Sequence, residues 1–71
     1  MKSKTFTYTP GPYMNDVQIT IQQEAAEGEK WYYWEIVGSN GNATSMEFDS
    51  ASECEKNAKQ MASNYSNKCM D

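Results

Sequence analysis

The stretch WYYWEIVGSNGNATSMEF, residues 31–48, decides the fold because it contains two predicted strands and the turn between them. It begins with four consecutive aromatic residues, 31–34, and later turns through Ser39-Asn40-Gly41. Side chains of a strand alternate between the two faces of a sheet, so only half of these aromatic rings can enter a small core. The other half must face water or a partner, and the register of the turn indicates which half.

Two hairpin turns are compatible with this stretch, and they predict opposite faces. A two-residue type I′ loop of Asn40-Gly41 would bury Glu35 opposite Met46 without a partner for the carboxylate. A three-residue loop, with Gly41 in the left-handed conformation, separates apolar from charged side chains, and we prefer it. It places Tyr32, Trp34 and Ile36 on the core face beside Thr44, Met46 and Phe48, and it places Trp31, Tyr33, Glu35, Val37, Ser45 and Glu47 on the opposite face.

Alternating apolar and polar side chains predict two further strands before this hairpin, at residues 4–9 and 16–23. The sequence Pro10-Gly11-Pro12 separates them. We expect residues 24–30 to form an exposed acidic connection with Gly28 as its turn residue. The aromatic stretch then supplies strands at 31–38 and 42–48.

The C-terminal part predicts one helix, residues 51–67. Ser50 is a suitable N-cap, and Glu53 three residues later completes a capping box. A stripe of small and apolar residues at helical spacing predicts that the helix lies on one face of the sheet. This stripe comprises Ala51, Cys54, Ala58, Met61, Ala62, Tyr65 and Cys69.

The predicted fold is a single α+β domain over residues 1–71. It consists of a four-stranded antiparallel meander sheet with one C-terminal helix packed on one face, a ββββα arrangement. The predicted core comprises Phe6, Tyr8, Val17, Ile19, Ile21, Trp34, Ile36, Met46, Phe48, Cys54, Ala58, Met61 and Tyr65.

The composition argues against enzymatic and metal chemistry. Ten acidic residues oppose six basic ones, and the chain contains no histidine, which is the commonest general base and zinc ligand. Cys54 therefore has no histidine base, and the carboxylates of Glu35 and Glu47 would lie on an open face instead of in a cleft. We find no CxxC pair, calcium loop or glycine-rich phosphate loop. The sequence predicts a protein that is not an enzyme and uses no metal or cofactor.

Cysteine usage and hydropathy predict a cytoplasmic protein. Cys54 and Cys69 would lie roughly 22 Å apart along one helix, too far for a disulfide. The sequence shows neither an export signal nor the roughly 20 apolar residues of a membrane span. We therefore expect free thiols in a reducing compartment and no membrane partner.

The sheet face away from the helix is the candidate binding surface. It combines aromatic anchors with carboxylates, as protein interfaces do, and the acidic connection would extend it toward a partner with a basic surface. Two other interpretations stay open: Trp31 could fold over the edge of the core, and the connection could serve only solubility. The predicted partner-binding residues are Trp31, Tyr33, Glu35, Val37, Glu47, Glu24, Glu27 and Glu29.

The segment from WYYWEIV to the end of NGNATSMEFDSASECEKNAKQMA resembles the strand–strand–helix part of the plant AP2 and phage integrase amino-terminal DNA-binding domains. The matching residues are Trp34, Ile36, Phe48, Asp49, Ser50 and Ala58. Those domains contact DNA with arginines and tryptophans on the exposed sheet, whereas this chain has Glu35 and Glu47 there and no arginine at all. The resemblance therefore implies architecture and not DNA contact.

A short, acidic, single-domain chain with a small sheet and a helix also resembles, in kind, the anti-CRISPR inhibitors encoded by phages. That resemblance implies stoichiometric binding to a CRISPR–Cas or other nucleic-acid-handling complex in the host cytoplasm. The net charge of −4 and the lack of arginine disfavour direct nucleic-acid binding. Two alternatives remain: a βββα-type nucleic-acid binder using Lys56, Lys59 and Lys68, and a structural subunit or homodimer that self-associates through the open face.

Overall fold

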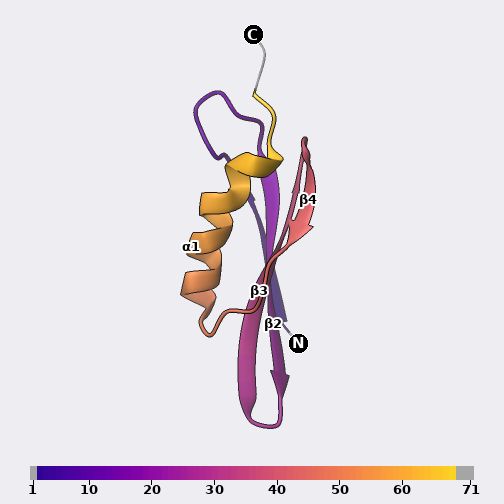
Figure 1. The fold of residues 1–71 in the computed structure, drawn as a ribbon, viewed down its shortest axis with the longest axis vertical. Helices are drawn as coiled ribbons and strands as arrows, with labels where there is room; N and C mark the ends of the chain where they lie inside the picture. The colour runs from indigo at the N-terminus through magenta and orange to yellow at the C-terminus, as the bar shows by residue number, and fades with distance from the viewer. Residues whose placement is uncertain (1, 69–71) are drawn as a thin grey trace.

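The computed structural model describes residues 2–68, which form one sheet and one helix (Figure 1). Strands β1 (Lys2–Tyr8), β2 (Val17–Ala26), β3 (Glu29–Gly38) and β4 (Gly41–Thr44) are antiparallel and lie in sequence order. Helix α1 (Ala51–Met61) follows and continues into a short 3-10 helix, η1 (Ala62–Tyr65). The predicted ββββα fold of the α+β class is confirmed.

One face of the sheet packs against α1 and η1 and forms the core. Only small side chains of the helices reach full burial, which lets the helical backbone approach the sheet closely. The indole nitrogen Nε1 of Trp34 donates a hydrogen bond to Asn57 Oδ1 at 2.8 Å, so the largest core side chain has its polar atom satisfied. The buried apolar residues are Val17, Ile19, Ile21, Trp34, Ile36, Cys54, Ala58 and Ala62.

Helix α1 begins where the sequence predicts and ends earlier than predicted. The hydroxyl oxygen of Ser50 accepts a hydrogen bond from the Glu53 amide at 3.2 Å, which is the expected N-cap. Helical backbone stops at Tyr65 instead of residue 67, because Ser66 is extended and its hydroxyl donates to the Asn15 carbonyl in the β1–β2 loop. Cys69, predicted to continue the apolar stripe, lies outside the described residues.

The predicted register of the β3–β4 hairpin is wrong near the turn. Ser39-Asn40 forms the loop, so Gly38 pairs with Gly41, and Ile36 pairs with Ala43 instead of Thr44. Gly41, predicted as the third residue of the loop, is instead the first residue of β4, although it does have a positive φ, 124°. The loop therefore has one residue fewer than the preferred three-residue loop. It also differs from the type I′ alternative, in which Asn40-Gly41 would form the loop.

The extra residue enters the hairpin farther along, as a bulge after β4. The Ser45 amide donates to the Trp34 carbonyl at 2.9 Å, while Tyr32 and Phe48 exchange backbone hydrogen bonds of 2.8 and 2.7 Å. Residues 46 and 47 therefore lie opposite the single residue Tyr33 of β3. Strand β4 consequently ends at Thr44 and not at residue 48, and Met46, predicted to be in the core, is 79% exposed.

The side chain of Ser45 gives the physical reason for this bulge. Its hydroxyl oxygen accepts a hydrogen bond from the Trp34 amide at 2.9 Å and donates to the Met46 carbonyl at 2.7 Å. A side chain therefore replaces the backbone acceptor that a regular strand would supply to Trp34. Phe48 then returns to pack against the core, as predicted.

The predicted acidic connection at residues 24–30 is instead the end of two strands. Strand β2 continues to Ala26 and β3 starts at Glu29, with Glu27-Gly28 as a two-residue turn. Both turn residues have positive φ, 53° and 84°, which is typical of a type I′ hairpin and confirms Gly28 as a turn residue. The exposed acidic character was predicted correctly, because residues 25–30 are all exposed.

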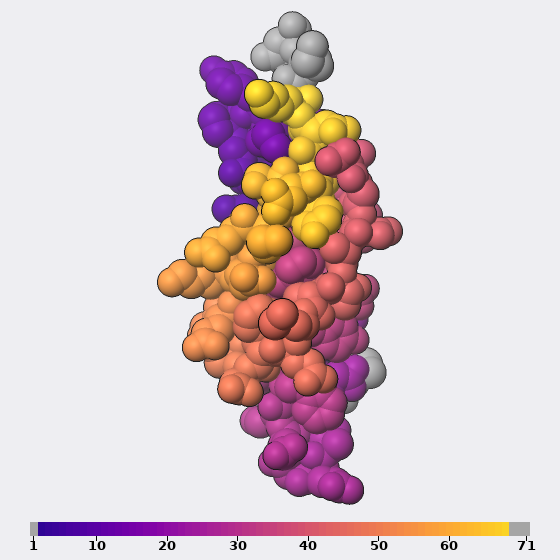
Figure 2. All heavy atoms as spheres, viewed as in Figure 1, coloured from indigo at the N-terminus to yellow at the C-terminus, as the bar shows by residue number. Residues whose placement is uncertain are grey.

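Residues 24–31 form a two-stranded projection that we call the β2–β3 ribbon. The pairing of β1 with β2 ends at Lys2 opposite Gln23, and the segment after β4 last contacts β3 at Tyr32. In residues 2–68, neither a third strand nor the helix accompanies the ribbon beyond these pairs, and the ribbon projects past the start of α1 (Figure 1). The molecule is consequently elongated, with extents of 51 × 17 × 16 Å, and the ribbon forms its narrow end (Figure 2).

Candidate interaction surface

The sheet face that points away from α1, which we call the outer face, is not covered by any element of residues 2–68. Side-chain alternation and the strand register place polar residues on it from all four strands. The buried positions of β3, Trp34 and Ile36, face the helix, so the residues between them face outward. The outer face comprises Ser3, Thr5, Thr7, Gln18, Thr20, Gln22, Glu24, Glu29, Trp31, Tyr33, Glu35, Val37, Asn42 and Thr44.

Five of these side chains form what we call the aromatic–acidic cluster: Gln22, Glu24, Trp31, Tyr33 and Glu35. Trp31 pairs with Glu24 across the strands, and Tyr33 pairs with Gln22. Gln22 Nε2 donates a hydrogen bond to Glu35 Oε1 at 3.2 Å. All five side chains are half-buried, which indicates that they pack on one another and do not extend freely into water.

The carboxylates of the cluster affect the pKa of Tyr33. Partial burial, the negative charges of Glu24 and Glu35, and a hydrogen bond to Glu24 together raise the pKa of the Tyr33 phenol above its usual value of 10. The phenol therefore stays protonated at neutral pH and serves as a hydrogen-bond donor toward Glu24. The cluster keeps two carboxylates beside two aromatic rings, an arrangement that suits an incoming cationic side chain.

The structure assigns different places to the other predicted binding residues. Glu29 shares the outer face with Trp31, and Glu27 lies at the tip of the ribbon. Val37 is 52% exposed at the far end of β3. Glu47 is exposed but lies in the bulge after β4, so no strand pairing places it on the outer face.

The two faces of the sheet carry opposite charges. The carboxylates of the strands, Glu24, Glu29 and Glu35, are all on the outer face. The lysines of the strands lie on the helix side instead: Lys2 and Lys4 pair with Gln23 and Ile21, and Lys30 alternates in phase with Trp34. Sequence reasoning missed this segregation, because Lys2 lies before the predicted strand at 4–9 and Lys30 lies in the predicted connection at 24–30.

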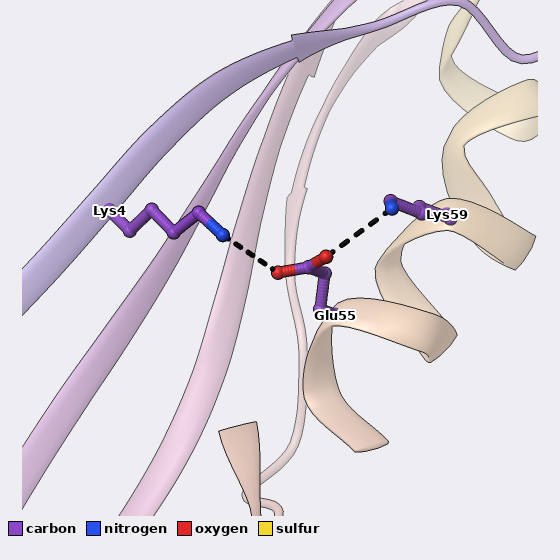
Figure 3. Close-up of polar contacts among 3 residues, drawn as sticks. All are labelled: Lys4, Glu55 and Lys59. Atoms are coloured by element: carbon purple, nitrogen blue, oxygen red, sulfur yellow. Dashed lines mark hydrogen bonds and ion pairs between the residues drawn. The ribbon is translucent and has the colours of Figure 1, made fainter. Parts of the chain in front are cut away.

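An ion cluster on the helix side joins β1 to α1 (Figure 3). Glu55 accepts from Lys4 Nζ at 3.2 Å and from Lys59 Nζ at 3.3 Å, and these two hydrogen bonds lower the pKa of the Glu55 carboxyl. The same ammonium groups lie 5.4 and 5.7 Å from the centre of the Phe6 ring. Lys59, one of the lysines considered for nucleic-acid contact, is therefore engaged within the protein.

Cys54 of α1 is a buried free thiol. Burial, and to a lesser extent the charge of Glu55, raises the pKa of the Cys54 thiol to about 11, so the thiol is protonated at neutral pH. Within residues 2–68, no three side chains of the His, Cys, Asp or Glu type gather where they could hold a metal ion. The helices of this part of the chain are too short or too polar to cross a membrane.

Comparison with known proteins found no family model that matches the chain, and no curated protein or solved structure that is similar to it.

Proposed function

We propose that this protein is a non-enzymatic binding module that docks on a basic surface of a protein partner. The observation that supports this proposal is the aromatic–acidic cluster on a sheet face that no described element covers. Aromatic residues supply large contact area with few rotatable bonds, and residues already held by strand pairing lose little further freedom on binding. Carboxylates of a single sign beside them select a partner that presents lysine or arginine.

The β2–β3 ribbon extends the same surface toward the partner. Its carboxylates Glu24, Glu27 and Glu29 outnumber its single lysine, Lys30. The type I′ turn holds the tip in one conformation, and small residues at 25 and 26 keep the ribbon narrow. A narrow acidic projection of this kind is suited to enter a basic groove on the partner, and less suited to bind a flat partner surface.

A basic groove is a property of proteins that hold nucleic acid. We therefore propose, more specifically, that the protein acts as a stoichiometric inhibitor that occupies the nucleic-acid channel of such a complex, as its resemblance in kind to phage anti-CRISPR proteins implies. The engaged state of Lys59 and the acidic outer face argue against the alternative of direct nucleic-acid binding. Self-association through the outer face would bring Glu24, Glu29 and Glu35 against their own copies, which opposes a face-to-face dimer.

Affinity capture with matched variants tests this proposal. The wild-type protein should retain one basic protein from an extract of the cells in which it acts, and the isolated pair should form a complex of fixed stoichiometry. Trp31→Ala and Glu35→Lys should lose the captured protein while the thermal midpoint stays nearly unchanged. Met46→Ala removes an exposed apolar side chain outside the cluster and serves as the control.

Two further results decide the outcome. Addition of the wild-type protein should displace nucleic acid from the captured partner, and raised salt should weaken the complex because its contacts are charged. Capture that is equally strong with Trp31→Ala and Glu35→Lys would show that the outer face is not the binding surface. A captured protein without any basic surface would contradict the electrostatic part of the proposal.

A further inference from the structure

A concave region lies on the opposite side of the sheet from the aromatic–acidic cluster. It is a hollow of about 300 Å³ at the start of α1. Residues 2–4 of β1 form one wall, Ala51 and Glu55 of α1 form the other, and Ile21, Gln23 and Tyr32 form the floor. We call it the helix-side hollow, and its volume is at the lower end of those that hold small ligands.

The hollow exists because α1 does not reach the end of the sheet face that it covers. The pair Ile21 and Trp34 is buried under the helix, whereas the next inward-facing pair, Gln23 and Tyr32, lies beyond it and is half-buried. Ala51, the first helical residue, is exposed and too small to close the gap. The ring of Tyr32, the edge of Ile21 and the polar side chain of Gln23 are consequently left partly open to solvent.

The charge around the hollow is positive, in contrast to the net charge of −4 for the chain. Lys2 and Lys4 line it, and Lys30 points to the same side of the sheet one position farther along the ribbon. The lining carboxylate, Glu55, is already bound by Lys4 and Lys59. Lys2 makes no ion pair within residues 2–68, so its ammonium group is available to a ligand.

We infer that the helix-side hollow binds a small amphiphilic carboxylate. Its charged group would lie at the ammonium group of Lys2, with Lys4 beside it still bound to Glu55, and its apolar body would cover the ring of Tyr32 and the exposed edge of Ile21. Binding would remove from water the apolar surface that the helix leaves uncovered, and it would place an anion beside the excess positive charge. The inference is independent of the proposed function, because it concerns the opposite face of the sheet.

A titration of the 71-residue protein with octanoate, followed by amide NMR, tests this inference. Saturable shifts are expected at residues 2–4, Gln23, Tyr32 and Ala51, with a dissociation constant near or below about 1 mM, as befits a small ligand in an open site. The neutral analogue 1-octanol should bind several-fold more weakly, because it lacks the charge that Lys2 and Lys4 attract.

Two variants and one control locate the site. Lys2→Gln should weaken octanoate binding about threefold to fivefold, the effect of one exposed charge pair. Ala51→Phe should abolish binding by filling the hollow from an exposed position, without removing any core side chain. Lys56→Gln makes the same change in net charge on an exposed residue outside the hollow, and it should bind octanoate as the wild type does.

Three results would overturn the inference. One is the absence of saturable shifts at millimolar octanoate. Another is equal affinity for octanoate and 1-octanol, which would make the hollow an apolar depression without anion selectivity. The third is equal weakening by Lys2→Gln and Lys56→Gln, which would reflect net charge instead of a site.

Discussion

At the scale of single residues, Glu55 is the side chain that connects the edge strand to the helix. Its two carboxylate oxygens bind Lys4 of β1 and Lys59 of α1 separately (Figure 3). Among residues 2–68, strand β1 pairs with β2 alone, so this ion cluster and the packing of Phe6 and Tyr8 hold its other side against the core. The contribution is modest, because the side chain of Lys4 is 67% exposed and that of Glu55 is 32% exposed.

The lowered pKa of Glu55 gives a pH dependence with a defined sign. Its pKa in the folded protein lies below the unfolded value of 4.5, so the ionised carboxylate stabilises the fold at neutral pH. That stabilisation is present above pH 4.5 and is lost as the pH falls through the folded pKa. We expect Glu55→Gln to lower the free energy of unfolding at pH 7 by no more than about 1 kcal/mol, and the difference from wild type to vanish in acid.

Urea denaturation of both proteins across the acid range measures this difference. Glu47→Gln, which changes an exposed carboxylate without an ion pair in the described part of the chain, is the control and should behave as wild type. A difference between Glu55→Gln and wild type that persists unchanged well below pH 4.5 would assign the effect to packing and not to charge.

Single residues also explain where the sequence interpretation failed. The alternation of β3 was predictable, because Trp34 and Ile36 are large and apolar while Glu35 between them is charged. The position of the extra residue in the hairpin was not predictable from this pattern. It depends on the Ser45 hydroxyl, which accepts from the Trp34 amide, and hydrogen bonds of this kind leave no periodic signal in a sequence. Met46 was assigned to the core for that reason.

At the scale of elements, the β2–β3 ribbon is the part of the proposed binding surface that lies outside the core. Its residues 25–30 are exposed and contribute nothing to the buried core. Their sequence, AAEGEK, lacks the β-branched and aromatic residues that favour strands, so it was interpreted as a loop. Pairing with the aromatic start of β3 and the type I′ turn override this weak local preference. Such tertiary effects are absent from a single local window of sequence.

Shortening the ribbon tests its role. Deletion of residues 25, 26, 29 and 30 removes two cross-strand pairs and retains the Glu27-Gly28 turn, and the remaining strand residues keep their faces. We expect the free energy of unfolding to change by less than about 1 kcal/mol, because no buried side chain is removed. Capture of the basic partner should fall strongly, because the projecting carboxylate Glu29 is lost and the tip is withdrawn.

The control for this deletion is Ala25→Ser combined with Ala26→Ser, which preserves ribbon length and charge. Undiminished binding by the shortened protein would restrict the interaction to the sheet itself. A large loss of stability would show instead that the ribbon supports the fold.

At the scale of the whole molecule, the sheet separates two regions of different chemistry. The outer face is acidic and aromatic, whereas the uncovered end of the helix side is basic and apolar. The outer face was largely predictable, since it follows from the alternation of two strands that adjoin in sequence. The helix-side hollow was not. The start of α1 and the small side chain of Ala51 were predictable, but the residues of β1, β2 and β3 that they lie against depend on long-range packing.

The placement of one tryptophan on each face allows a direct test of the central claim, that the outer face is the binding surface. Trp31 lies on the outer face, and Trp34, 4% exposed, lies under the helix. Fluorotryptophan incorporated into the protein gives one fluorine NMR signal for each of these two tryptophans. Titration with the captured partner should shift the Trp31 signal to saturation at a fixed stoichiometry and leave the Trp34 signal nearly unmoved. A shift of Trp34 without a shift of Trp31, in a complex that forms, would contradict the account.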